Sequence, residues 1–165
     1  MGAFFLGDNL MNNYMYTSTK SYRQIAPCAY RQWKAQSHCN QIHGYAFSFH
    51  FEFSTNELDA YNWVVDYGGL KPLKTLLEDW FDHTLLVAED DPMKDELVRL
   101  GELGLAKITF VEKTGCEGIA DFLYQYINDC FLPDYGWGER VWCTKVEVRE
   151  TDSNMAYRSG DRPNA

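Results

Sequence analysis

The fold is decided by the segment 44-GYAFSFHFEFS-54, in which aromatic residues alternate with small or polar ones. One face of an extended chain would carry Tyr45, Phe47, Phe49, Phe51 and Phe53, and the other Ser48, His50 and Glu52. This period of two predicts a β-strand, and a strand with one apolar side is typical of an antiparallel sheet. His50 has the opposite parity to His43 and is therefore predicted to point away from it.

Further elements follow on both sides of this strand. Residues 30–36 are predicted to form a partner strand that turns at 37–42, and residues 63–67 a second short strand. Helical spacing of apolar residues predicts helices over 70–81 and 93–103, and a third from Cys116. Strands are expected at 107–112 and 140–150, with one face of the last shared by five residues: Trp142, Thr144, Val146, Val148 and Glu150. This order predicts an α+β domain, with an antiparallel sheet and helices packed on one face.

The 165 residues correspond to one domain, and 45% of them are apolar, which is enough for a packed core. We expect a single domain over 1–165 with loosely ordered ends at 1–20 and 159–165. The apolar runs are shorter than the roughly 20 residues that a membrane span needs, and the first residues lack the basic region of a secretory signal. No membrane association is predicted.

Charge and cysteine content restrict the environment and the partners. The five cysteines are scattered without a CxxC pair, which argues against a disulfide framework and indicates a reducing, cytoplasmic location. The formal net charge of −9 argues against nucleic-acid binding, because a phosphate backbone requires a basic face.

The segment 37–45 places His38, Cys39 and His43 in a predicted hairpin tip. Neutral imidazoles are good zinc ligands, and a metal or a cationic imidazole beside Cys39 would favour its thiolate, the form that a nucleophile or a general base requires. The spacing alone equally fits a polar turn with a half-buried thiol, because HxxxxH is not a specific zinc signature.

Asp82 and His83 follow the first predicted helix. A carboxylate can orient an imidazole and raise its basicity, which suits proton transfer. Adjacent side chains need not meet, however, and a histidine at a helix C-terminus also interacts favourably with the helix dipole. Both readings stay open on these residues alone.

Two glutamates are candidates for ligand binding. Glu150 shares the face of Val146 and Val148, so it is predicted to point inward, where a carboxylate has to be paired, protonated or bound to a ligand. A ligand edge with two adjacent N–H donors could be accepted by such a carboxylate in bidentate fashion. A strand-end residue that reaches solvent is the alternative for Glu150, and dipole stabilisation in the first turn of a helix is the alternative for Glu117.

The order of these motifs resembles the 6-pyruvoyl-tetrahydropterin synthase / 6-carboxy-tetrahydropterin synthase family. The resemblance covers roughly residues 30–157 and is carried by five segments: 39–45 (CNQIHGY), 63–67 (WVVDY), 81–83 (FDH), 117–120 (EGIA) and 146–151 (VEVRET). They are similar, in this order, to the family's Cys-x-x-x-His-Gly-His segment, its apolar-apolar-Asp-Phe strand, its Leu-Asp-His motif, its Glu-Asn-Leu-Ala helix start and its Glu-Thr strand ending.

The resemblance implies a tunnelling fold, in which protomers assemble their sheets into a barrel, usually as a hexamer with active sites between subunits. Carried over by position, it implies a catalytic set of Cys39, Asp82 and His83. Glu150 becomes the anchor of the pterin ring and Glu117 a second substrate contact. Zinc is the implied cofactor, a small pterin the implied substrate, and the protein a homo-oligomer.

The chain departs from the family pattern at the metal. His43 matches a ligand position, but Tyr45 stands where another metal histidine is expected. The family's first metal histidine lies well ahead of the cysteine, whereas His38 directly precedes Cys39. The expected metal set is therefore His38, His43 and Tyr45. The segment 88–113 is expected to be an insertion relative to compact members of the family.

The expected function is that of a zinc-dependent carbon–oxygen or carbon–carbon lyase. It would convert 7,8-dihydroneopterin triphosphate to 6-carboxytetrahydropterin, a step towards queuosine and other 7-deazapurines. The alternatives are 6-pyruvoyltetrahydropterin synthase activity, related side-chain cleavage without tight zinc dependence, and a non-catalytic pterin- or purine-binding homologue without zinc.

Overall fold

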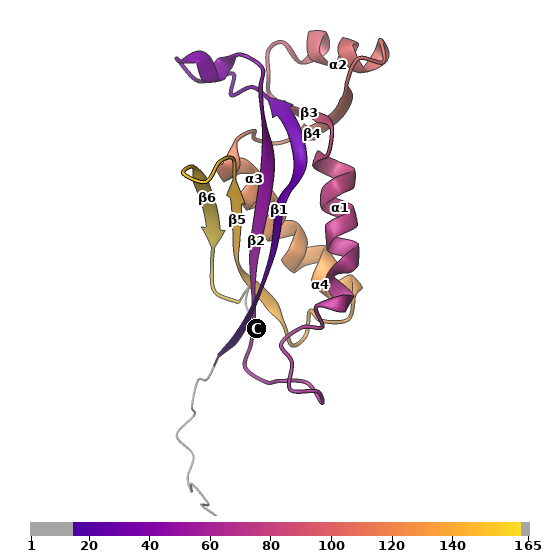
Figure 1. Ribbon diagram of the computed structural model, residues 1–165, viewed down its shortest axis with the longest axis vertical. Helices are drawn as coiled ribbons and strands as arrows, with labels where there is room; N and C mark the ends of the chain where they lie inside the picture. Colours follow the sequence, from indigo (N-terminus) through magenta and orange to yellow (C-terminus); the bar gives the residue numbers. More distant parts are fainter. Residues whose placement is uncertain (1–14, 163–165) are drawn as a thin grey trace, which may run out of the picture.

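The computed structural model describes residues 15–162 and contains one six-stranded sheet in the order β4-β3-β1-β2-β5-β6. The strands and helices are listed here in chain order: β1 (Tyr16–Tyr30), β2 (His43–Thr55), α1 (Lys71–Phe81), β3 (Thr84–Ala88), α2 (Lys94–Glu102), β4 (Lys107–Val111), α3 (Cys116–Tyr126), α4 (Leu132–Asp134), β5 (Trp142–Arg149) and β6 (Met155–Ser159). Figure 1 shows α1 alongside β1 and α3 crossing behind the sheet, while the near side of β1 and β2 is uncovered. The expected helices on one face are confirmed.

The sheet is mixed rather than wholly antiparallel. β1 pairs antiparallel with β2, β2 with β5 and β5 with β6, as the alternation in β2 predicts. β3 and β4 extend the sheet beyond β1 as parallel strands. The segment 88–113, expected to be an insertion, contributes α2 and β4 to this edge.

The core lies between the sheet and its helices. Four β2 residues of one parity are almost completely buried: Phe47, Phe49, Phe51 and Phe53. They pack with the buried faces of α1 and α3, and the rings of Phe49 and Phe81 lie 5.5 Å apart. Large buried rings contribute strongly to core stability, so β2 is the centre of the fold.

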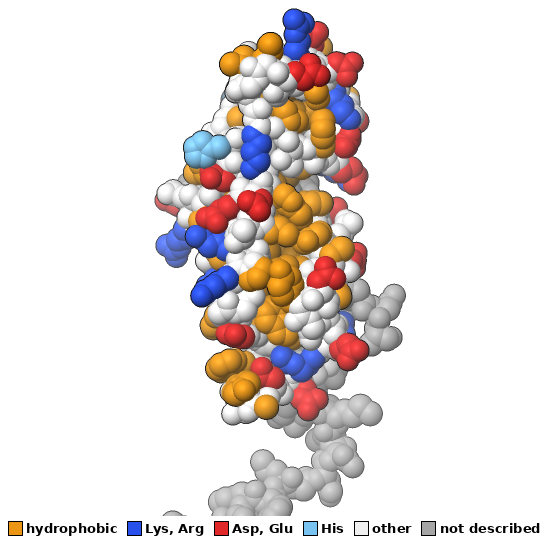
Figure 2. Space-filling view, turned by 90° about the vertical axis from the view of Figure 1, so that its right-hand side faces the viewer, with side chains coloured by type: hydrophobic (Ala, Val, Ile, Leu, Met, Phe, Trp, Pro, Cys, Tyr) orange, Lys and Arg blue, Asp and Glu red, His pale blue; other side chains and the backbone are white. Residues whose placement is uncertain are grey.

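The helices also contact each other on their outer side. Trp80 of α1 lies 5.3 Å from Phe122 and 4.8 Å from Tyr126, both on α3. Figure 2 views the molecule from the α1 side and shows a band of hydrophobic side chains along this surface. These ring contacts hold the two helices together over the sheet.

Residues 63–67 form a loop, and the prediction of a strand there is wrong. Val64 and Val65 are buried in the core, which explains their apolar character. Arg140 replaces a partner strand: its guanidinium donates to the carbonyls of Glu57 (2.9 Å), Trp63 (3.3 Å) and Val64 (2.8 Å). Buried backbone groups need hydrogen-bond partners, and a side chain satisfies them here.

The first strand begins earlier than expected. β1 starts at Tyr16, inside the segment 1–20 that was expected to be loosely ordered, and β6 ends at Ser159. Residues 1–14 and 163–165 lie outside the described part. No helix within residues 15–162 is long and apolar enough to cross a membrane.

The uncovered face of the sheet carries the polar side chains. His50 faces this side as predicted: its Nδ1 lies 2.7 Å from Ser21 Oγ, and its Nε2 lies 3.7 Å from Glu52 Oε1. It lines a cavity of about 660 Å³ together with Arg23 and Arg149. The two faces of the sheet thus offer different environments, one apolar and covered by helices, the other polar.

Candidate functional site

Three rings meet where β1 ends and β2 begins. Tyr30 and His43 are direct cross-strand partners, and their ring centroids are 5.1 Å apart. Tyr45 lies 5.4 Å from His43 and 6.1 Å from Tyr30. Side chains of opposite residues on paired strands lie close, so the hairpin register brings these groups together. We call Tyr30, His43 and Tyr45 the ring cluster.

Glu150 faces the ring cluster from the end of β5. The Tyr30 hydroxyl donates a hydrogen bond to Glu150 Oε1, across the intervening strand β2. The predicted inward orientation of Glu150 is therefore confirmed, since Tyr30 is fully buried and Glu150 is half-buried. Among the described residues, no arginine, lysine or histidine forms an ion pair with this carboxylate.

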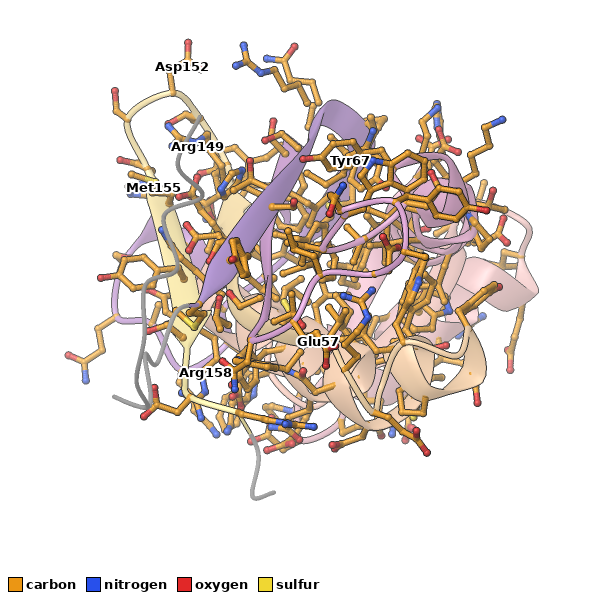
Figure 3. The ribbon with its side chains drawn as sticks, turned by 90° about the horizontal axis from the view of Figure 1, so that it is seen from below. Glu57, Tyr67, Arg149, Asp152, Met155 and Arg158 are labelled. Atoms are coloured by element: carbon orange, nitrogen blue, oxygen red, sulfur yellow. The ribbon has the colours of Figure 1, made fainter. Side chains whose placement is uncertain are left out.

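The turn after Glu150 is fastened by Arg149. Its guanidinium donates to Asp152 O and to Met155 Sδ, both at 2.9 Å, and to Glu147 Oε1 at 2.9 Å. Figure 3, seen from below, shows Arg149 between the turn that carries Asp152 and the side of β6 that carries Met155. The Glu150 backbone N–H also donates to Asn154 O at 3.1 Å. These bonds fix the backbone that presents the Glu150 carboxylate.

The N-terminus of α3 lies beside the end of β1. Cys116 is buried there, and the pKa of its thiol is raised to about 12 by burial and then by the charges of Glu150 and Glu117. Gly115 precedes it with φ +94, and a Cβ at this position would lie 2.4 Å from Gln32 Nε2 and 3.7 Å from Glu117 Oε2. The left-handed φ favours glycine here, since other side chains are strained in that conformation. Gln32 and the exposed Glu117 therefore lie beside Gly115 at the start of α3.

Both phenols of the ring cluster keep their protons at neutral pH. The pKa of Tyr30 is raised by burial, and then by its hydrogen bond to Glu150 and the charge of that carboxylate. The pKa of Tyr45 is raised by burial and then by the charges of Glu150 and Cys39. A buried phenol close to a carboxylate resists ionisation because a second negative charge is unfavourable there. Tyr30 and Tyr45 are therefore neutral hydrogen-bond donors.

Cys39 lies beside this cluster, on the turn between β1 and β2. It is half-buried, and its carbonyl accepts a hydrogen bond from the Gln32 N–H at 2.9 Å. Cys39 precedes His43 by four residues along this turn. The structure thus brings together Tyr30, His43, Tyr45 and Glu150, with Cys39 on the turn that leads into β2.

The Asp82–His83 pair is not hydrogen-bonded to the ring cluster in the described residues. His83 Nδ1 is 2.7 Å from Asp82 Oδ1, so these adjacent side chains do meet, with the backbone of His83 at φ +52. The His83 side chain is 84% exposed, and it lines a shallow depression with Gly44 and Tyr45. Within residues 15–162, no hydrogen bond or ion pair joins Asp82 or His83 to Cys39. Their catalytic role stays a prediction.

The expected metal set is not assembled. His38 is exposed on a short 3-10 turn, His38–Asn40, and in the described part of the chain it has no ring contact with His43 or Tyr45. The third ring beside His43 and Tyr45 is instead Tyr30. Of the residues described, no three His, Cys, Asp and Glu side chains are grouped so that they could hold a metal ion. One imidazole and two protonated phenols do not fit a zinc site, because zinc binds deprotonated or neutral nitrogen, sulfur and oxygen donors.

Tyr30, Cys116 and Gln32 were not predicted from the sequence. Tyr30 was placed at the start of a strand over 30–36, whereas it ends β1. The signal that could have identified it is its position in the hairpin, directly opposite His43. Finding this signal requires the register of β1, which the bulge between Tyr22 and Ala26 disguises.

The sheet with helices on one face, and the ring cluster bonded to the Glu150 carboxylate, define an α+β protein with a candidate ligand-binding site. A family model described as 6-pyruvoyl tetrahydropterin synthase matches residues 22–161. The match spans most of the chain, so this protein belongs to the 6-pyruvoyl tetrahydropterin synthase family. Membership supports a pterin-processing lyase at the level of the family.

Individual relatives agree with this assignment. The chain is 29% identical over 126 residues to 6-carboxy-5,6,7,8-tetrahydropterin synthase of Aquifex aeolicus, covering 74% of this chain and 76% of that protein. Among solved structures, an uncharacterised protein from Wolinella succinogenes matches with a TM-score of 0.77 at 18% identity, covering 90% of this chain and 99% of that one. The 6-pyruvoyltetrahydropterin synthase of Plasmodium vivax matches with a TM-score of 0.58 at 13% identity, covering 88% and 99%. These structural matches confirm the tunnelling fold.

Proposed function

We propose that this protein is a lyase that converts 7,8-dihydroneopterin triphosphate to 6-carboxytetrahydropterin, a precursor for 7-deazapurines such as queuosine. The observation that carries the proposal is the Glu150 carboxylate, held by the Tyr30 hydroxyl beside His43 and Tyr45. The similarity to the Aquifex aeolicus protein, whose name states the 6-carboxy product, favours this reaction over formation of 6-pyruvoyltetrahydropterin.

Glu150 is suited to bind the ring of a reduced pterin. The amino group and the adjacent ring N–H point in the same direction, so one carboxylate can accept from both. Tyr30 donates to Oε1, and no cation pairs with the carboxylate among the described residues, so acceptor capacity and negative charge remain for a ligand. Glu117 at the start of α3 would contact the same substrate from the edge of the pocket.

The proton transfers are assigned to side chains. Cys39 as thiolate would remove a proton from a side-chain carbon of the substrate, and an imidazole oriented by a carboxylate would return protons to it. His83 is oriented by Asp82 in this manner, but among the described residues no hydrogen bond joins it to Cys39. We therefore place His83 of a neighbouring copy at each Cys39, in a closed homo-oligomer, with a hexamer as the expected size.

A non-catalytic pterin- or purine-binding protein is the second candidate. It is favoured by the ring cluster, in which two tyrosines accompany the single histidine. Such a protein would keep ring recognition by Glu150 and lack turnover.

The test is to incubate the purified full-length protein with 7,8-dihydroneopterin triphosphate and to identify the pterin products by mass spectrometry. We expect 6-carboxytetrahydropterin, because the pocket retains the carboxylate and thiol that the reaction needs. Formation of 6-pyruvoyltetrahydropterin would replace the proposed product, and binding without turnover would establish the second candidate. If the protein neither binds the triphosphate nor turns it over, both candidate functions are contradicted.

A further inference from the structure

The ring cluster occupies the place where the family resemblance puts zinc. His43 holds a matching ligand position, and Tyr45 stands two residues later, where a histidine is expected. The remaining expected histidine lies ahead of the cysteine with a loop between them. Tyr30 meets that description, because it precedes Cys39 and the loop at 31–37 separates the two.

The donor atoms of this cluster are already committed in ways that disfavour a metal. The Tyr30 hydroxyl is bound to Glu150, so this oxygen would have to lose both its proton and its partner before it could bind a cation. His43 Nδ1 lies 2.7 Å from Gln41 O, and because a carbonyl only accepts, Nδ1 carries the proton. His43 Nε2 is then the one nitrogen of the cluster that could bind a metal.

We infer that this protein binds its ligand without a divalent metal, and that Tyr30 fills the metal position and orients Glu150. Tyr30 is completely buried and packs against Phe47 as well as His43, so its ring is fixed by its neighbours. Its hydroxyl therefore presents a fixed donor to the carboxylate, and Tyr30 is a positioning residue. The positioning role of Tyr30 rests on the proposed function, whereas the inference that the protein needs no metal is independent of it.

Zinc content tests the inference directly. The wild-type protein and His43→Ala are each equilibrated with excess zinc sulfate, dialysed, and analysed by inductively coupled plasma mass spectrometry. We expect the same low content in both, far below the about one ion per chain of a specific site. About one zinc per wild-type chain that is lost in His43→Ala would overturn the inference.

Restoring histidines provides a gain-of-binding control. Tyr30→His/Tyr45→His is expected to acquire about one zinc per chain, because three imidazoles would then converge. If circular dichroism shows that the double variant does not fold, Tyr45→His alone replaces it, because this variant leaves the buried Tyr30 intact. We expect Tyr45→His to bind zinc more tightly than the wild type. Variants that fold but bind no more zinc than the wild type would show that the tyrosines do not exclude the metal, contrary to the inference.

A second readout uses neopterin, a stable fluorescent pterin, with and without EDTA. EDTA is expected to change the affinity of neopterin for the wild-type protein by less than about two-fold. If a bound metal contributed to neopterin binding, its removal would change the affinity by about 5–150-fold, the usual range for coupling between two ligands. A larger loss on chelation that zinc restores would contradict the metal-free pocket. Neither readout requires turnover, so a failed activity assay leaves both results interpretable.

Discussion

Replacement of Glu150 by glutamine is expected to weaken neopterin binding by about 100-fold. Hydrogen bonds to a charged group contribute about 1.5–3 kcal/mol each, and each 1.4 kcal/mol corresponds to about tenfold in affinity. A glutamine amide also directs N–H donors towards the N–H groups of the pterin edge, so at least one of the two bonds is lost. Fluorescence titration of purified Glu150→Gln against the wild type measures the change.

Glu52→Gln is the matched control for this experiment. Glu52 lies on β2 with its side chain on the uncovered face of the sheet, where it pairs with Lys145 at 3.2 Å. Its neutralisation should leave neopterin affinity unchanged. Equal affinity of Glu150→Gln and the wild type, with both variants folded by circular dichroism, would refute the assignment of Glu150 as the ring anchor.

Cys39→Ala is expected to lower kcat by about 10²–10⁴, the usual contribution of a positioned acid–base group, while neopterin affinity is retained. The Tyr30–Glu150 hydrogen bond does not involve Cys39, so removal of the thiol is expected to leave ring recognition intact. Steady-state assays with 7,8-dihydroneopterin triphosphate measure the change in kcat.

Cys130→Ala controls for the loss of a thiol as such, because Cys130 is exposed on the π-helical turn Ile127–Phe131, away from the pocket. It should retain full activity. If Cys39 and His83 of neighbouring copies form one site, reassembling equal amounts of Cys39→Ala and His83→Ala chains should recover about a quarter of the sites. Full activity of Cys39→Ala would remove the thiol from the mechanism.

The sequence predicted those helices and strands whose apolar residues recur with a single period, either that of a helix or that of a strand. The alternation in β2 and the helical spacing of α1 identify their elements because each has one face in the core. β3 is missed because all five of its residues are buried, so it shows no alternation. The apolar pair Val64–Val65 is misread as part of a strand because a buried loop, with Arg140 bound to its carbonyls, has the same composition.

The candidate site was predictable residue by residue but not as an assembly. The parity of β5 correctly predicts the inward orientation of Glu150. Trp142 and Thr144, however, do not share the face of Val146, because the register of β5 against β2 shifts between Glu52 and Phe53. His38 was expected beside His43 and Tyr45, but Tyr30 is found there. This difference likewise depends on strand register, which no local pattern reveals.

We propose above all that a pterin binds through Glu150, beside the ring cluster. A crystal structure with neopterin bound tests it most directly. We predict that the amino group and the adjacent N–H of the ring lie about 2.7–3.0 Å from the Glu150 carboxylate oxygens, within reach of the ring cluster. Neopterin bound instead in the cavity beside His50 and Arg149, on the uncovered face of the sheet, would contradict the account.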